Sequence, residues 1–331
     1  MAGRGVADAA ERSPFAVVGY LPEYRLDGFN YTAAFQSGLT HLIFFSLEVG
    51  EDGSLQALDR VPSALKLRRA REAADAVGGK LLLGFGGNAR SHGFGPMALK
   101  PATRALFLTN LNTLLTKYSL DGVDYNWEYP RNDEEWRAWY SLMKESKEQL
   151  LLDGKAIVTF TIYLDPNHYR VISEYKLMDV ADFVLCMAYD QNGKHSTEAF
   201  FSSGIDYALR FKIPLSKFVN GLPFYGRDTR NGEPKTYGEL IPKIEAKFGN
   251  AAFDISADSV QTKHGHFDTV HHQYYNARNT IAFKTQEALR RRIGGVMIWE
   301  LGQDVQPVSD ARSLLTAIQE TVRSAPETSD L

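Results

Sequence analysis

The chain has 331 residues, enough for one large domain or two modest ones, and its formal net charge of -3 argues against nucleic acid or an anionic membrane surface as a main partner. The single cysteine, Cys186, excludes an intrachain disulfide, and its place in an apolar run indicates a buried small hydrophobic residue. No run of 18 apolar residues occurs, so no membrane span is expected.

Short apolar, β-forming runs recur along the chain and alternate with segments of helical length. We expect strands near 16–20, 40–48, 80–85, 121–127, 155–163, 182–188, 217–222 and 294–300. Helical spacing of apolar residues predicts helices over 62–77, 102–117, 133–152, 238–248 and 282–292, with Pro101, Asn132 and Asp133 as start signals. Eight near-continuous hydrophobic strands alternating with helices favour a closed (β/α)8 barrel, the TIM barrel. No glycine-rich dinucleotide fingerprint follows the first strand, which counts against a Rossmann fold.

The expected organisation is one barrel domain over residues 15–323. Residues 1–14 are polar and charged, show no apolar core of a signal peptide, and are predicted to be a flexible segment. Residues 324–331 are predicted to be a disordered tail. The irregular stretch over 228–292, between the seventh and eighth strands, is too short for a full extra α+β domain.

The most informative segment is 121–130, Asp-Gly-Val-Asp-Tyr-Asn-Trp-Glu-Tyr-Pro. Asp124, Asn126 and Glu128 occupy every second position, so in a strand their side chains share one face. Such a row is expensive to bury unless its members are paired or used. Because catalytic groups in (β/α)8 barrels come from the carboxyl ends of the strands, we expect this row at the barrel mouth.

The other strand ends add hydroxyl, amide and aromatic groups to the same mouth. The sixth strand ends in Tyr189 and Asp190, the seventh leads into Tyr225 and Arg227, and the eighth carries Trp299. One dominant acid, several hydrogen-bonding groups and an aromatic floor suit a neutral, polyhydroxylated ligand with an apolar ring face.

These residues carry a resemblance to a known family. The pattern Asp-Gly-x-Asp-x-x-x-Glu followed by Tyr-Pro resembles the signature of the family 18 glycoside hydrolases, the chitinases, in which the sixth place normally holds Asp rather than Asn126. Further segments resemble other strand motifs of that family in the same order: Gly19-Tyr20, Gly86-Gly87, Met187-Ala188-Tyr189-Asp190, Gly221 to Arg227 and Gly294 to Glu300. The resemblance extends along almost the whole barrel.

The resemblance implies a retaining, substrate-assisted hydrolysis of β-1,4-linked N-acetylglucosamine, with no cofactor and no metal. Glu128 would be the general acid, and the 2-acetamido oxygen of the sugar would attack the anomeric carbon. Asn126 would meet the acetamido N–H, Asp124 would support it from beneath, and Tyr189 would bond the acetamido oxygen. The implied substrate-binding set is Tyr20, Gly86, Gly87, Asp121, Tyr129, Met187, Asp190, Tyr225, Arg227 and Trp299. Within it, Asp121 would hold the strand end and Trp299 would form the floor under the sugar.

Asn126 leaves three explanations open. The protein is an active enzyme with a weaker or pH-shifted optimum, a chitin-binding, lectin-like relative without turnover, or a chain carrying an introduced substitution. The retained Glu128 favours hydrolysis, because a binding protein has no need of the acid. Hydrolysis of the chitobiose core of glycoproteins is a further alternative, which the continuation Trp127-Glu128-Tyr129-Pro130 disfavours.

The expected partners are chitin or N-acetylglucosamine oligosaccharides, with no nucleic acid and no membrane, and we expect a monomer. The resemblance suggests secretion, although no signal peptide is visible. The cluster His264, His266, His271 and His272 lacks a carboxylate or cysteine at a familiar zinc spacing, so we predict a solvated loop there.

Overall fold

A parallel barrel forms the centre of the molecule. The computed structural model describes residues 15–151 and 155–325. The barrel strands are β1 (Ala16–Pro22), β2 (His41–Val49), β4 (Lys80–Gly86), β5 (Gly122–Asn126), β6 (Ile157–Tyr163), β7 (Phe183–Met187), β8 (Phe218–Pro223) and β13 (Gly295–Trp299). Each pairs with its neighbours in parallel, and the β1–β2 and β1–β13 pairings close the ring. The (β/α)8 prediction is confirmed, with all eight expected strands in place.

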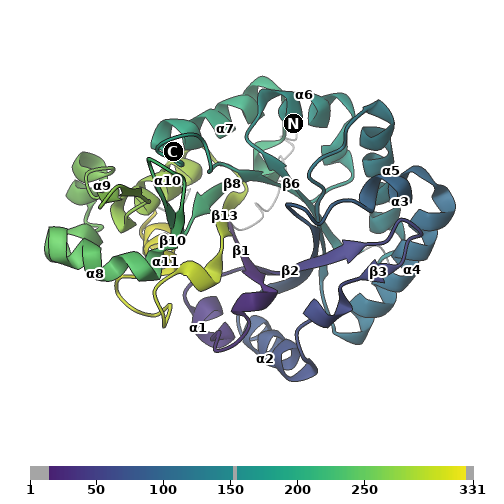
Figure 1. Cartoon of the computed structure of the whole chain (residues 1–331), viewed down its shortest axis with the longest axis horizontal. Helices are drawn as coiled ribbons and strands as arrows, with labels where there is room; N and C mark the ends of the chain where they lie inside the picture. Colours follow the sequence, from purple (N-terminus) through teal and green to yellow (C-terminus); the bar gives the residue numbers. More distant parts are fainter. Residues whose placement is uncertain (1–14, 152–154, 326–331) are drawn as a thin grey trace, which may run out of the picture.

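Helices surround the barrel (Figure 1). They are α1 (Tyr31–Gln36), α2 (Ala64–Asp75), α3 (Phe94–Leu99), α4 (Pro101–Lys117), α5 (Asp133–Gln149), α6 (Pro166–Glu174), α7 (Glu198–Arg210), α8 (Tyr237–Phe248), α9 (Ala257–Lys263), α10 (Arg278–Arg290) and α11 (Leu314–Ser324). The predicted start signals are confirmed: α4 begins at Pro101, and the Asn132 side chain caps α5 by accepting from the Glu135 N–H. Six-residue helices such as α1 and α3 escaped prediction because they are too short to show a period.

A small insertion lies between β8 and β13. It contains β9 (Tyr225–Asp228), β10 (Pro234–Thr236), β11 (Thr269–Val270) and β12 (Gln273–Tyr274), which form an antiparallel sheet in the order β10-β9-β12-β11, together with α8 and α9. The sequence predicted an irregular stretch with one helix here, because strands of two to four residues show no readable alternation. The insertion stands to one side of the barrel, at the left of Figure 1.

Buried apolar side chains form two clusters, one inside the barrel and one around it. An inner cluster includes Val18, Ile43, Leu82, Val219 and Met297. A larger cluster lies between the strands and the helices and includes Cys186, which is a free, buried cysteine as predicted. Such burial, at roughly 25 cal/mol per Å², is the main force that holds the strand ends in place.

The two segments predicted to be flexible lie mostly outside the residues that the structure describes. Residues 1–14 and 326–331 lie outside the described residues, and Ser324, where the predicted tail begins, is the last residue of α11. Among the described helices, none combines the length and apolar character needed to cross a bilayer.

The short hairpin strand β3 (Leu55–Gln56) pairs with the end of β2.

Candidate active site

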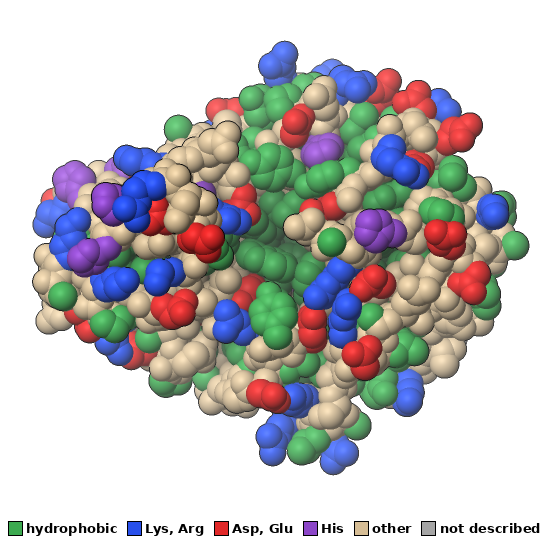
Figure 2. Space-filling model, viewed as in Figure 1, with side chains coloured by type: hydrophobic (Ala, Val, Ile, Leu, Met, Phe, Trp, Pro, Cys, Tyr) green, Lys and Arg blue, Asp and Glu red, His purple; other side chains and the backbone are tan. Residues whose placement is uncertain are grey.

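A cavity of about 380 Å³ opens at the carboxyl ends of the barrel strands. Figure 2 shows this hollow near the centre of the face, lined mainly by hydrophobic side chains and bordered by charged ones. Its lining residues are Tyr24, Phe45, Asn88, Arg90, Asn126, Glu128, Tyr129, Tyr163, Met187, Tyr189, Asp190 and Trp299. The volume lies in the usual range for ligand pockets, and the lining joins the predicted acid, amide, tyrosine and tryptophan at one place.

Asp124 lies beneath the cavity as the innermost member of the polar row on β5. Its side chain is fully buried, and the Tyr20 hydroxyl donates to Oδ2 at 2.8 Å while the Thr159 hydroxyl donates to Oδ1 at 2.7 Å. Burial raises the pKa of Asp124 to about 6, although these hydrogen bonds oppose the shift. Tyr20 therefore supports the row from below instead of facing the cavity.

Glu128 follows the end of β5 and reaches the cavity. Burial raises the pKa of Glu128 to about 7, opposed by a hydrogen bond from the Asn126 side chain. The Glu128 backbone N–H donates to Ser91 Oγ at 3.1 Å, which holds this part of the chain to the loop after β4. A carboxyl group with this pKa is protonated in a large fraction of molecules at neutral pH, as a general acid requires.

Asn126 presents an unused acceptor. Its side chain is 3 % exposed, and its Oδ1 has no hydrogen-bond partner within residues 15–151 and 155–325. Because the amide donates to Glu128, the carbonyl oxygen is left for another donor. A buried acceptor without a partner costs about 1–3 kcal/mol, so a ligand N–H that reached it would relieve this cost.

The aromatic rings of Trp299 and Phe45 line the cavity, and the Tyr20 ring packs against both from outside it. The Trp299 centroid lies 5.4 Å from that of Tyr20 and 5.0 Å from that of Phe45, and the Tyr20 and Phe45 rings meet edge to face at 5.4 Å. Gly87 makes room for this arrangement: it has a φ of +98°, and a Cβ there would lie 2.5 Å from the Phe45 ring. At Gly86 a Cβ would lie 2.3 Å from the Asn126 carbonyl oxygen, so a side chain would push β4 away from β5.

Asp190 is tied to the insertion. The Tyr225 hydroxyl donates to Oδ1 at 2.6 Å, and the Arg227 guanidinium donates to Oδ1 at 2.5 Å and to Oδ2 at 2.9 Å. Burial alone would raise the pKa of Asp190, but the hydrogen bonds from Arg227 and Tyr225, together with the nearby His195, outweigh it and hold the pKa well below the usual range. Asp190 therefore faces the cavity as a carboxylate, while Tyr225 and Arg227 orient it from behind.

Asp121 is the one predicted site residue that lies far from the mouth. It precedes β5 and therefore lies at the amino-terminal end of the barrel strands, where Arg71 donates to Oδ2 at 2.6 Å and the Leu81 N–H donates at 2.8 Å. The prediction that Asp121 belongs to the substrate-binding residues is wrong. A residue that precedes a barrel strand lies at the opposite end of the barrel from the residues that follow the strand. Its contacts are those of a structural anchor.

Replacing Asp121 is expected to destabilise the fold. Asp121→Ala removes the partner of a half-buried guanidinium and of a backbone N–H, so we expect the free energy of unfolding to fall by about 1–3 kcal/mol in denaturant titrations. The control is Asp75→Ala, because Asp75 is the exposed partner of the same Arg71 at 2.8 Å. We expect that control to cost less than about 0.5 kcal/mol. Equal losses in the two variants would contradict the anchor role.

Several lining residues were not predicted. Phe45, Arg90 and Tyr163 line the cavity, and Thr159 holds Asp124. The carboxyl-end rule could have found Tyr163, which is the last residue of β6, whereas Phe45 lies in the middle of β2. Arg90 lies in a loop and is held by Glu23 at 2.7 Å, a pairing that no local pattern reveals.

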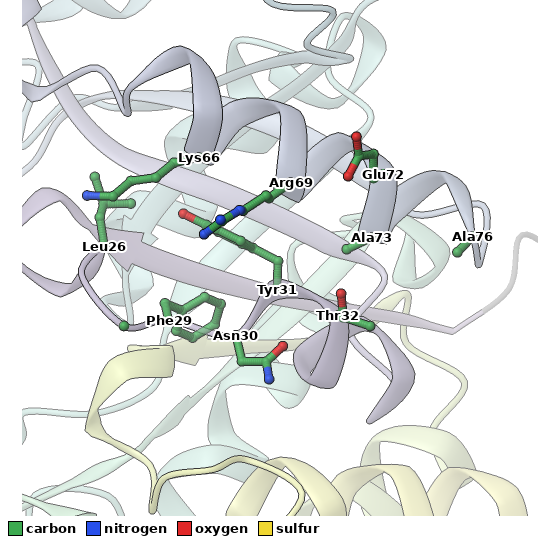
Figure 3. Close-up of a pocket in the computed structure, with 11 residues that line it drawn as sticks. Leu26, Phe29, Asn30, Tyr31, Thr32, Lys66, Arg69, Glu72, Ala73 and Ala76 are labelled. Atoms are coloured by element: carbon green, nitrogen blue, oxygen red, sulfur yellow. The ribbon is translucent and has the colours of Figure 1, made fainter.

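A larger hollow of about 590 Å³ lies between the segment around α1 and helix α2, outside the barrel mouth (Figure 3). Its polar rim is formed by Asn30, Thr32, Lys66, Arg69 and Glu72. It contains no paired carboxyl and amide of the kind found on β5, so size alone does not identify the reactive site.

The histidine-rich segment belongs to the insertion. His266, His271 and His272 are exposed, and His264 is half-buried and stacks on Phe283 with centroids 3.9 Å apart. In the part of the chain that the structure describes, no three His, Cys, Asp or Glu residues are arranged to hold a metal ion.

Comparison with known protein families shows which family this chain belongs to. The model of the glycosyl hydrolases family 18 matches residues 16–304. The chain belongs to this family. The resemblance stated from the strand motifs is thereby confirmed.

Named relatives and solved structures agree with this assignment. The chain is 27% identical over 286 residues to chitinase A1 of Niallia circulans, and 26% identical over 267 residues to endochitinase 1 of Metarhizium anisopliae, each match covering 68% of this chain. These matches span 40% and 62% of the two relatives. A chitinase from Bacteroides thetaiotaomicron superposes with a TM-score of 0.73 at 23% identity, covering 94% of this chain and 97% of that one, which shows a shared fold.

Proposed function

We propose that this family 18 barrel hydrolyses β-1,4-linked N-acetylglucosamine in chitin or its oligosaccharides, with retention of configuration. The observation that carries the proposal is the pairing of Glu128, whose pKa is raised to about 7, with the unpartnered Asn126 carbonyl in one cavity. The acid suits a glycosidic oxygen, and the amide acceptor suits the N–H of a 2-acetamido group. The named chitinase relatives support the same class of substrate.

In the proposed mechanism the sugar ring before the cleaved bond lies on Trp299. Glu128 gives its proton to the glycosidic oxygen as the bond to the anomeric carbon breaks. The 2-acetamido oxygen attacks that carbon from the opposite face and forms an oxazolinium ion. Water then attacks from the face that the leaving group left, giving its proton to the Glu128 carboxylate, so the configuration is retained. The Asn126 Oδ1 accepts from the acetamido N–H, and the Tyr189 hydroxyl, which contacts Met297 Sδ at 3.7 Å, turns to the acetamido oxygen.

Asn126 makes this a slow enzyme in the proposal. A carboxylate at this position would place a negative charge beside the oxazolinium ion, whereas the amide contributes only a dipole. The loss of one such preorganised charge costs about 3 kcal/mol, or roughly 10²–10³ in rate. Glu128 retains its proton-donating role, so the proposal is reduced activity and not its absence.

The test compares two fluorogenic oligosaccharides that differ only in the 2-substituent. We expect slow release of the fluorophore from the N-acetylglucosamine oligomer and none from the corresponding β-1,4-glucose oligomer, because only the former carries the internal nucleophile. The first-formed product should be the β-anomer by NMR. Equal rates on the two substrates, or an α-product, would refute the mechanism.

The pH dependence provides a further prediction. The general acid acts only when protonated, so kcat/KM should be constant below the pKa of Glu128, about 7, and fall above it by about tenfold per pH unit. Initial rates from pH 5 to 9 measure this limb. A rate that rises through pH 7 would indicate that Glu128 acts as a base.

A binding protein without turnover is the second candidate, and the missing charge at Asn126 is the observation that favours it. The two candidates differ in calorimetry and turnover taken together. Tight binding of the N-acetylglucosamine oligomer with no detectable hydrolysis would select the lectin-like function, because the aromatic floor and the Asn126 acceptor serve binding as well.

A further inference from the structure

His195 is a buried histidine whose hydrogen-bonding groups are unused. It lies in the loop between β7 and α7, its side chain is fully buried, and neither ring nitrogen has a hydrogen-bond partner among the described residues. Burial lowers the pKa of His195 despite the nearby Asp190, so the ring is neutral and carries one N–H. Buried polar groups nearly always have a hydrogen-bond partner, so a buried imidazole without one beside the candidate active site is unusual.

The imidazole lies against the two residues that shape one side of the cavity. His195 Nδ1 is 3.6 Å from Asp190 Oδ1. Its ring lies on the Tyr225 ring, with centroids 4.9 Å apart and planes 36° apart, and it meets the edge of the Tyr274 ring at 5.9 Å. The imidazole therefore touches both Asp190 and the tyrosine that donates to Asp190.

The next residue fixes the position of His195. The Ser196 carbonyl accepts three hydrogen bonds, from Lys284 Nζ at 2.9 Å, Asn276 Nδ2 at 2.9 Å and the Tyr274 hydroxyl at 3.2 Å. The Ser196 hydroxyl donates to the Ala188 carbonyl at 2.9 Å. These donors come from β12, α10 and the turn between them, so the insertion and helix α10 hold this loop.

The backbone of Asp190 also needs support. Its φ of +67° lies in the left-handed region, which costs an ordinary residue about 1–2 kcal/mol. The Gln191 N–H donates to the His195 carbonyl at 3.1 Å and closes the loop directly after Asp190. The same loop thus places the imidazole and stabilises the backbone that aims Asp190 into the cavity.

We propose that His195 is a positioning residue for sugar binding, which donates from Nδ1 to Asp190 when a ligand occupies the mouth. This inference rests on the proposed function. Arg227 and Tyr225 hydrogen-bond the Asp190 carboxylate, and a shift of roughly 0.5 Å brings His195 Nδ1 within hydrogen-bond distance of it. Arg227 is one-third exposed, so a sugar hydroxyl that takes over one of its bonds lets the carboxylate turn toward the imidazole.

Two amide variants test the geometry. Asn places its amide nitrogen near the position of Nδ1, whereas Gln places it near that of Nε2. We expect His195→Asn to keep KM for the N-acetylglucosamine oligomer within about threefold and His195→Gln to raise it about tenfold, with kcat changed less than about threefold in both. Equal KM values for the two variants would overturn the proposal, as would a loss confined to kcat.

The matched controls use a histidine at the other end of the barrel. His41 Nδ1 lies 2.8 Å from the Thr40 hydroxyl, and its ring meets the Phe183 edge at 5.7 Å. His41→Asn and His41→Gln should lower the melting temperature without separating in KM. In an Asp190→Asn background the two His195 variants should no longer differ, because the positioned group has been changed; a persisting difference would show that His195 acts elsewhere.

A measurement without turnover separates this inference from the proposed function. Nitrogen NMR of histidine-labelled protein should show His195 as the neutral tautomer protonated at Nδ1, and a tautomer protonated at Nε2 would overturn the inference. If the unmodified chain neither binds nor hydrolyses the oligomer, the proposed function fails, and the tautomer still decides whether the imidazole can donate to Asp190.

Discussion

Asn126→Asp is expected to raise kcat on N-acetylglucosamine oligomers by about 10²–10³. The substitution is nearly isosteric and places a carboxylate where the proposed oxazolinium ion develops its charge. The new carboxylate can still accept from the acetamido N–H through the oxygen that corresponds to the unpartnered Asn126 Oδ1. The gain should therefore appear in kcat with little change in binding.

The same substitution should move the pH profile. The Asn126 amide now lowers the pKa of Glu128 by donating to it, and a carboxylate at 126 would remove that donor and add a like charge. Both changes raise the pKa of Glu128, so the decline of kcat/KM should begin at a higher pH than in the unmodified chain. The control, Asn126→Ala, lacks donor and acceptor and should be slower than the unmodified chain. No gain in the Asp variant, with binding intact, would leave the lectin-like candidate standing.

Glu128→Gln is expected to lower kcat by about 10²–10⁴ and to leave the dissociation constant of the oligomer within about threefold. Gln keeps the shape of the side chain but has no acidic proton to give to the leaving oxygen. Stopped assays measure the rate, and calorimetry on the same sample measures binding.

Glu135→Gln is the matched control for that variant. Glu135 is a buried carboxylate in the first turn of α5, seven residues after Glu128, and it pairs with Arg131 at 2.7 Å. Its loss should reduce stability while turnover per folded molecule stays near that of the unmodified chain. A comparable loss of rate in both variants would assign the effect to disturbance of this loop and not to the acid.

Much of the barrel was predictable because its signals are local. Each strand is a short apolar run, and helix starts such as Pro101 and Asn132 act through their own backbone neighbours. The insertion was not predictable in the same way, since β11 and β12 have two residues each and gain their stability from pairing with β9 and each other. Periodicity needs longer elements than these.

The candidate site likewise contains residues that local sequence patterns predicted and residues that they did not. The alternation of Asp124, Asn126 and Glu128 was readable because strand geometry places every second side chain on one face. Asp121 was misplaced because sequence proximity to that row hides the fact that a strand carries its two ends to opposite sides of a barrel. Phe45 packs against Trp299, and Arg90 is hydrogen-bonded to Glu23. Both partners are far away in the sequence, so no local pattern predicts that Phe45 and Arg90 line the cavity.

The sequence by itself determined the family, the barrel and the chemical types at the mouth, because those follow from short-range patterns of apolar, acidic and aromatic residues. Only the tertiary structure decided the protonation of these groups and their partners. Burial raises the pKa of Glu128 to about 7, and groups from distant segments hold Asp124 and Asp190. Desolvation and hydrogen bonding depend on what surrounds a side chain in space, and the linear order of residues does not contain that information.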